Sequence, residues 1–192
     1  MINDTVQFPG FNINLRKATL ADRPIIYNWL AKSTSTKSML GEPTFPDAPA
    51  PNWNEFVDDF CDGFFTDSVG NNGKCFIIRN KHYEIGTVCY DLMNLTKKYV
   101  LLDIWLKDEK YCGHGYGSET LLLLCIYLFN AKGIKYFYTA PSLRNIRAIK
   151  SYEKAGFNKL KMNRSEAKRK FGIDIFDYRD NVVMKKVIKE SF

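Results

Sequence analysis

The chain is 192 residues long, with 45% apolar and 26% charged residues, so one domain spanning residues 1–192 is expected and default disorder is excluded. The net charge of +7 is compatible with nucleic acid, a membrane surface or a phosphate-rich cofactor, and does not choose between them. No signal peptide is recognisable and no apolar run approaches the roughly 20 residues that span a bilayer, so we predict a cytoplasmic protein without a membrane partner.

The N-terminal third predicts one strand and two helices. Residues Asn12–Lys17 alternate polar and apolar side chains, which is typical of a strand. Thr19 is a candidate N-cap for a helix that ends at about Ala31, and Asn52 is a candidate N-cap for a second helix. Four prolines between residues 33 and 51 predict a long loop between these helices.

The middle of the chain predicts an antiparallel β-meander followed by a glycine-rich turn. The three strands of the meander are Lys74–Arg79, Glu84–Leu92 and Tyr99–Leu106. The glycine-rich loop runs from Cys112 to Gly117 and opens onto an apolar helix over Ser118–Ala131, which Gly133 ends.

The C-terminal third predicts a short strand over Tyr136–Thr139, a helix over Asn145–Ala155 that Gly156 ends, and final strands over Phe157–Lys161 and Phe176–Val187. Antiparallel strands are thus followed by an alternation of strands and helices. This order predicts an α+β or mixed α/β fold with the glycine-rich loop near the centre of the sheet.

Charged residues and cysteines are unevenly distributed. The segment 39–73 holds seven acids and no Lys or Arg, which indicates either a solvated face or a surface that attracts cations. The basic segment Lys159–Lys170 is either solvated or in contact with phosphates or RNA. The cysteines form no CxxC pair and only two histidines are present, so we predict reduced thiols and no metal site. Those expected to be packed among apolar residues are Cys61, Cys75, Cys89 and Cys125.

The loop between Lys110 and Ser118 is suited to binding an anion. Its glycines at alternate positions, Gly113, Gly115 and Gly117, allow successive N–H groups to point inward, and the following helix adds its positive dipole end. No Gly-Lys-Ser/Thr follows, which disfavours a P-loop, and the preceding antiparallel strands disfavour a dinucleotide-binding βαβ unit. The loop is a candidate pyrophosphate site or, alternatively, a flexible strand–helix turn.

A second motif follows some thirty residues later, with the pattern Asn145-x-x-Ala148-x-x-x-Tyr152-x-x-x-Gly156-Phe157. Together with Cys112-x-x-Gly115-x-Gly117, it resembles the GNAT superfamily of acetyl-CoA-dependent N-acetyltransferases. In element order the resemblance covers about residues 12–188. It implies a GNAT-like acyl-CoA N-acyltransferase fold, in which helices flank a central, mostly antiparallel twisted sheet. It also implies acetyl-CoA as co-substrate without a metal, and makes a homodimer a candidate assembly.

The resemblance implies a place for each residue of the two motifs. The pyrophosphate would lie on the residues Cys112, Gly113, His114, Gly115, Tyr116, Gly117 and Ser118. The strand before the loop would splay from its neighbour, so that the main chain of Ile104, Trp105 and Leu106 lies along acetyl-CoA. Asn145 and Ala148 would contact it from the second helix. One departure is that Cys112 stands where the family carries Arg or Gln.

Two side chains would take part in the chemistry. Asp103 stands ten residues before Gly113, which resembles the position of the acid that faces the acceptor amine in aminoglycoside 6'-N-acetyltransferases. An ordinary Asp, with a pKa of about 3.9, is a weak base for an amine, so positioning is its larger expected contribution; the alternative is a strand-edge charge facing solvent. Tyr152 would protonate the CoA thiolate, and its alternative is a core aromatic residue.

Three functions are therefore compared. The first is acetyl transfer from acetyl-CoA to a small cationic amine, such as an aminoglycoside 6'-amine, with the acidic segment 39–73 steering the acceptor. The second is N-acetylation of a ribosomal protein or a protein N-terminus. The third is a non-catalytic nucleic-acid-binding domain, which is disfavoured because it leaves the glycine-rich loop and the Tyr152 motif unexplained.

Overall fold

The computed structural model describes residues 5–35, 50–67, 73–94 and 99–189, and its eight strands form one sheet in the order β1-β2-β3-β4-β5-β6-β8-β7. The strands are β1 Thr5–Val6, β2 Asn14–Lys17, β3 Gly73–Arg79, β4 Glu84–Asn94, β5 Tyr99–Leu106, β6 Tyr136–Thr139, β7 Asn158–Lys159 and β8 Met184–Val187. Neighbouring strands are antiparallel except β5 and β6. The predicted mixed fold with a mostly antiparallel sheet is confirmed.

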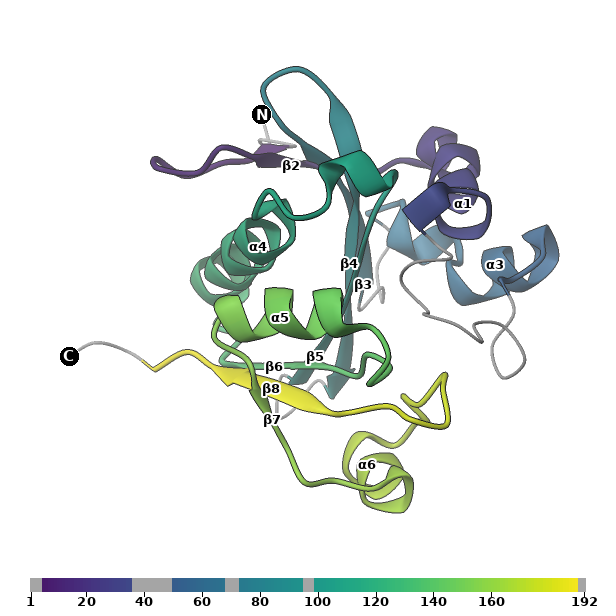
Figure 1. Ribbon diagram of the computed structural model, residues 1–192, viewed down its shortest axis with the longest axis vertical. Helices are drawn as coiled ribbons and strands as arrows, with labels where there is room; N and C mark the ends of the chain where they lie inside the picture. The colour runs from purple at the N-terminus through teal and green to yellow at the C-terminus, as the bar shows by residue number, and fades with distance from the viewer. Residues whose placement is uncertain (1–4, 36–49, 68–72, 95–98, 190–192) are drawn as a thin grey trace.

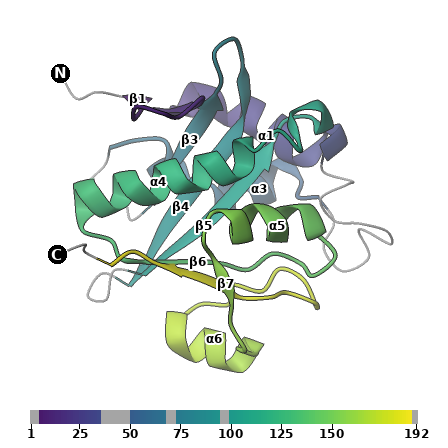
Figure 2. The same cartoon turned by 60° about the vertical axis from the view of Figure 1, so that its left-hand side comes forward.

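Helices cover both faces of the sheet (Figures 1 and 2). The α-helices are α1 Arg23–Ala31, α3 Trp53–Asp59, α4 Tyr116–Lys132, α5 Ile146–Lys154 and α6 Arg164–Phe171. Helices α4 and α5 lie on one face, above the largest cluster of buried apolar side chains. Helices α1 and α3 lie on the other face over a second, aromatic-rich cluster, and α6 packs near the β7–β8 edge.

The predicted meander is confirmed as β3, β4 and β5. The last of these strands, β5, separates from β6 part-way along its length. Strand β5 pairs with β6 only through residues 99–101. The Lys107 N–H donates to the Ile85 carbonyl of β4 at 2.9 Å. Because main-chain groups alternate along a strand, those of Ile104 and Leu106 then point away from β4. At the end of β5, the main-chain groups of Ile104 and Leu106 therefore face the opening between β5 and β6. Those of Trp105 face β4, so its main chain does not lie along the opening as the resemblance implied.

The C-terminal segments depart most from the prediction. Strand β8 covers only Met184–Val187 instead of Phe176–Val187, and β7 is limited to two residues. Residues 177–180 form a turn instead, in which the Tyr178 N–H donates to Asn181 Oδ1, and Asn181 forms an isolated β-bridge with Ser142. Helix α6 was missed because it is strongly charged and lacks an apolar stripe, although Asn163 and Glu166 form a capping box at its start.

The N-terminal predictions are largely confirmed. Strand β2 begins at Asn14. Helix α1 follows a short 3₁₀ turn and ends at Ala31, and Asn52 caps α3. Strand β1 was not predicted; its two residues are too few for an alternation to register. Of the loop predicted over 33–51, positions 34 and 35 are helical, and residues 36–49 lie outside the described part of the chain.

The cysteine prediction is corrected at three positions. Cys75 and Cys89 face each other across β3 and β4, with 4.3 Å between their Cα atoms, and form a disulfide instead of two reduced thiols. Such closely opposed positions are typical of non-hydrogen-bonded antiparallel pairs. Cys61 is exposed at the end of the α3 segment, so it is not packed. Cys125 is buried in α4, as predicted.

Candidate active site

The glycine-rich loop forms an open cradle of backbone amides. Gly113 and Gly115 have φ angles of +82° and +85°, which favour glycine, and a Cβ atom at either would meet nothing within 4 Å. Helix α4 begins at Tyr116, two residues earlier than predicted. No described residue accepts a hydrogen bond from the N–H groups of residues 113–118. These features fit a diphosphate at a helix N-terminus.

Cys112 does not contribute its amide to this cradle, because its N–H donates to the Glu109 carbonyl at 2.8 Å. Its side chain is half-buried, and burial raises the pKa of the thiol. The anion-binding amides therefore begin one residue later than the sequence motif indicated.

The loop closes one end of a cleft between the end of β5 and α5. Most of the predicted coenzyme-binding residues line this cleft: Ile104, Trp105, Leu106, Cys112, Gly113, Gly115, Gly117, Ser118, Asn145, Ala148 and Tyr152. His114 and Tyr116 do not line it; the His114 side chain is exposed and its ring lies 5.9 Å from that of Tyr116. Their backbone amides remain part of the cradle.

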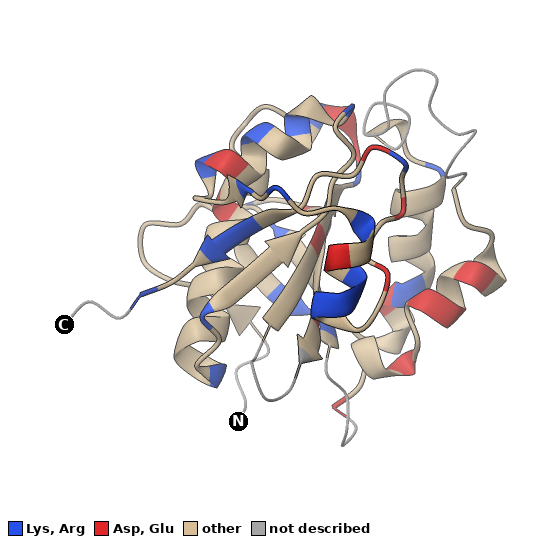
Figure 3. Ribbon diagram, turned by 90° about the horizontal axis from the view of Figure 1, so that it is seen from below, with Lys and Arg blue, Asp and Glu red and all other residues tan. Residues whose placement is uncertain are grey.

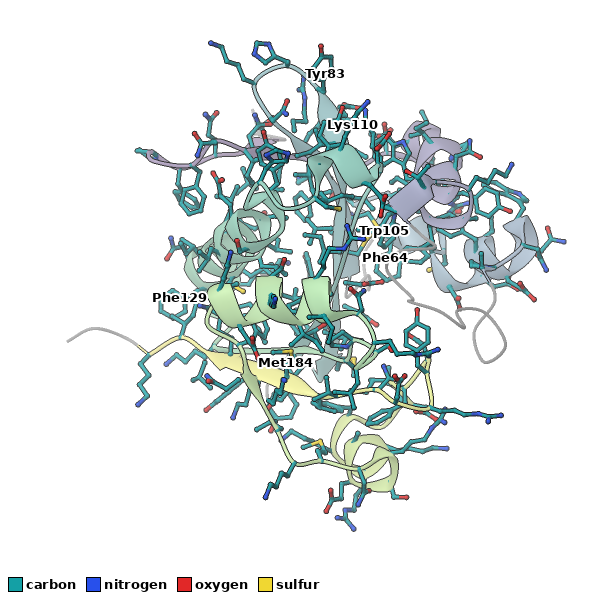
Figure 4. All side chains as sticks on the ribbon, in the orientation of Figure 1. Phe64, Tyr83, Trp105, Lys110, Phe129 and Met184 are labelled. Carbon is teal, nitrogen blue, oxygen red and sulfur yellow. A yellow bond between two sulfur atoms is a disulfide. The ribbon has the colours of Figure 1, made fainter. Side chains whose placement is uncertain are left out.

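A second cavity joins the cleft at a shared wall. The shared residues are Ile104, Trp105, Asn145, Ala148 and Tyr152. On its far side the second cavity is lined by Asp103, Thr139 and Asp177. Trp105 lies at the centre of the molecule between α5 and α3 (Figure 4). Its ring is buried edge-on against Phe60, at 5.6 Å between centroids.

Asp103 projects into the second cavity from β5. Its side chain reaches solvent, yet the surrounding protein restricts its hydration, and this desolvation raises its pKa to about 6. The charge of Asp177 raises the pKa further, while the Ile104 N–H, which donates to Asp103 Oδ1 at 2.9 Å, lowers it. The carboxylate therefore lines a cavity beside the cleft and is at the same time exposed, on the part of β5 beyond its pairing with β6.

Asp177 is a site residue that the sequence analysis missed. Desolvation raises its pKa, and the charges of Asp59 and Asp174 raise it further, against a smaller lowering by Arg164. It lies in the turn that was predicted as part of a strand, where it would have been one of many alternating polar residues. Its isolated sequence position carries no signal; only the folding of this turn over β5 brings it to Asp103.

Tyr152 lies on the shared wall and is 3% exposed. Burial raises the pKa of its phenol well above the ordinary value, the charge of Asp103 adds to this, and a hydrogen bond with the Thr139 side chain lowers it. The ring also packs edge-on against Phe157, with 5.5 Å between centroids. Tyr152 is thus a buried aromatic residue of the core, as the alternative interpretation expected, and it also lines both cavities. Its role as a proton donor stays a prediction.

Asn145 caps α5, because its Oδ1 accepts the Ala148 N–H at 3.0 Å. The cap occupies the side-chain oxygen and leaves the amide NH₂ for the cleft and cavity that Asn145 lines. Among the residues that the structure describes, no group of three His, Cys, Asp or Glu side chains is placed to hold a metal ion. No helix within those residues is both long and apolar enough to cross a bilayer.

Residues 12–158 match the family model of the acetyltransferase (GNAT) domain. The chain belongs to the GNAT acetyltransferase family. It is an acetyl-CoA-dependent N-acetyltransferase, and the amide cradle is a suitable site for the coenzyme's pyrophosphate. The chain is 38% identical over 58 residues to a kanamycin resistance protein of Rhizobium radiobacter, a match that spans 30% of this chain and 54% of that protein.

Two solved structures share the fold at low identity. One is the aminoglycoside acetyltransferase AAC(6')-Ib in complex with paromomycin and acetyl-CoA, with a TM-score of 0.69 and 20% identity over 92% of this chain and 93% of that chain. The other is an acetyltransferase of Salmonella typhimurium that modifies the N-terminal serine of ribosomal protein L7/L12. Its TM-score is 0.71, with 16% identity over 96% of this chain and 99% of that chain.

Proposed function

We propose that this GNAT enzyme acetylates a primary amine of a small polycationic acceptor, of the aminoglycoside 6'-amine type. The observation that carries the proposal is the pair of carboxylates, Asp103 and Asp177, that line a cavity directly beside the coenzyme cleft. Two nearby carboxylates favour a ligand with more than one positive charge, and Arg164 offsets the charge of Asp177 only in part, because the pKa of Asp177 remains raised.

The charge around this cavity supports a cationic acceptor. Acidic residues gather on α3 and the turn that follows it, at the right of Figure 3. Asp59, at the end of α3, is close enough to Asp177 to raise its pKa. The described part of the acidic segment therefore continues the negative potential of the cavity outward, which is suited to attracting a polycation.

The residues of the chain divide the chemistry between them. Bound acetyl-CoA supplies an acetyl group activated as a thioester. The amides of residues 113–118 would hold its diphosphate. The Ile104 N–H donates to Asp103 Oδ1 in this structure, and would have to exchange this partner for the acyl oxygen in order to polarise the thioester. Asp103 would orient the acceptor ammonium and accept its proton, for which a pKa of about 6 makes it a better base than an ordinary Asp.

Tyr152 would act on the leaving group, the thiolate of CoA. The hydroxyl is protonated at neutral pH and would donate a hydrogen bond to the departing thiolate. Because its pKa is raised, Tyr152 is a weaker acid than an ordinary tyrosine, and the negative charge on the nearby sulfur would be stabilised mainly by this hydrogen bond. Its place on the wall shared by the two cavities is consistent with a donor between coenzyme and acceptor.

A panel assay of CoA release tests the acceptor class. Wild-type enzyme is incubated with acetyl-CoA and either aminoglycosides, polyamines, amino acids or N-terminal peptides. We expect turnover with the polycations, and Asp177→Asn should raise the KM of a polycationic acceptor at least fivefold while leaving that of a monoamine within twofold. The control is Glu153→Gln, at an exposed position of α5 that lines neither cavity. Equal effects on mono- and polyamines would contradict the role given to Asp177.

The second candidate is acetylation of a ribosomal protein or another protein N-terminus. The fold shared with the Salmonella enzyme favours keeping it, and such acceptors are also cationic. It predicts that N-terminal peptides are acetylated in preference to free aminoglycosides and polyamines, so the same panel decides between the two.

A further inference from the structure

The coenzyme cleft lacks a charged side chain at the first position of its loop. Residue 112 is a cysteine, and burial raises the pKa of its thiol, so it carries no charge at neutral pH. A thiol is a weak hydrogen-bond donor and gives a diphosphate little beyond what the backbone amides provide. A charged partner for the diphosphate must come from another element.

Helix α5 is held close to this loop. A Cβ atom at Gly117 would lie 3.3 Å from Ser151 Oγ, so the first turn of α4 and the middle of α5 are in contact. Arg147 lies four residues before Ser151, which places both on the same face of α5. Arg147 also lines the coenzyme cleft. The helix packing therefore directs the arginine toward the start of the loop.

The Arg147 guanidinium reaches the side chain of residue 112. It hydrogen-bonds the Cys112 thiol and, through Nη2, donates to Glu109 Oε1 at 2.9 Å. Glu109 lies in the 3₁₀ turn η3, Glu109–Tyr111, directly before the loop. A guanidinium has five N–H donors, so the contact with Glu109 leaves others for an anion. The guanidinium thus lies beside residue 112 in an exposed ion pair, which leaves it free to turn toward an anion.

We propose that Arg147 binds the pyrophosphate of acetyl-CoA from α5, in place of a charged or amide side chain at position 112. The proposal rests on the assignment of the cleft to acetyl-CoA and is independent of the acceptor. The other cations among the described residues that line the cleft are Lys150 and Lys154, and the acids whose charges act on Cys112 are Glu109 and Asp108. Arg147 is favoured over the two lysines because its guanidinium contacts residue 112 and its planar fork suits a diphosphate.

Calorimetry with three ligands tests this proposal. CoA, 3'-dephospho-CoA and pantetheine are titrated into wild type and Arg147→Met, which keeps an unbranched side chain and removes the charge. For Arg147→Met we expect at least tenfold weaker binding of both CoA and dephospho-CoA, and unchanged binding of pantetheine, which has no diphosphate. In a separate kinetic assay, kcat/KM with S-acetylpantetheine as the acetyl donor should stay within twofold of wild type. The control Arg169→Met, on the exposed side of α6, should leave all values unchanged.

A double variant separates lost recognition from damage. Cys112→Arg introduced into Arg147→Met should restore CoA affinity to within about threefold of wild type, because the guanidinium returns to the loop itself. CoA binding by Arg147→Met within twofold of wild type would overturn the proposal, as would an equal loss with S-acetylpantetheine. A loss with CoA but not with dephospho-CoA would assign Arg147 to the 3'-phosphate instead and also overturn it. If wild type itself binds no CoA, the assignment of the cleft fails.

Discussion

Replacing Asp103 by Asn should lower activity and raise stability at neutral pH. The substitution keeps the shape of the side chain and removes the charge that faces the acceptor cavity. Loss of a positioned acid or base costs typically 10²–10⁴-fold in rate. Asp103, with a pKa of about 6, is ionised at pH 7.5 but is a weak base for an amine, so we expect a loss at the lower end of this range. The fall in kcat/KM for the amine should be at least tenfold, and CoA affinity should stay within twofold of wild type.

The pH dependence makes this expectation specific. Wild-type kcat/KM for the amine should fall about tenfold for each pH unit below 6, because protonation removes the carboxylate, and Asp103→Asn should lack this limb. Between pH 3.8, the ordinary pKa of an aspartate, and about pH 6, Asp103 is protonated in the folded chain and deprotonated in the unfolded chain. The contribution of this group to stability therefore decreases as pH rises through that window, and is lost above it.

The activity assay measures CoA release between pH 5 and pH 8.5. Thermal unfolding of both proteins is measured separately at pH 3.5 and at pH 7.5. Asp103→Asn should unfold at a higher temperature than wild type at pH 7.5, and the difference should shrink at pH 3.5. An acid limb that persists in Asp103→Asn with the same midpoint would refute the assignment, since another group would then be titrating.

Two further predictions concern the shared wall and the sheet. Tyr152→Phe should lower kcat at least tenfold and leave the KM for acetyl-CoA within twofold, because the ring keeps its contact with Phe157 and only the proton donor is lost; unchanged kcat would contradict this role. Fresh denatured protein should titrate three thiols of five, and Cys75→Ala/Cys89→Ala should lose about 2–4 kcal/mol of unfolding free energy in urea, as expected for a disulfide across a separation of 14 residues. Five reactive thiols would show that the pair is not bonded.

Local signals in the amino-acid sequence were sufficient for much of the fold. The three strand-like segments in the middle of the chain predicted β3, β4 and β5, and Asn52 and Gly133 marked helix ends that the structure bears out. The glycine spacing of the loop and the Tyr152 motif carried the resemblance to the GNAT family, which the family match confirms. These features depend on φ angles, capping bonds and side-chain periods, which a few neighbouring residues determine.

Contacts between distant residues depended on the tertiary structure. Asp177 joins Asp103 only because the turn after α6 folds over β5, and Cys75 meets Cys89 only in the observed register of β3 and β4. Likewise, Arg147 reaches residue 112 because Gly117 allows α5 to pack closely on α4. Each of these depends on how elements pack, and no local propensity encodes the distance between side chains that are far apart in the chain.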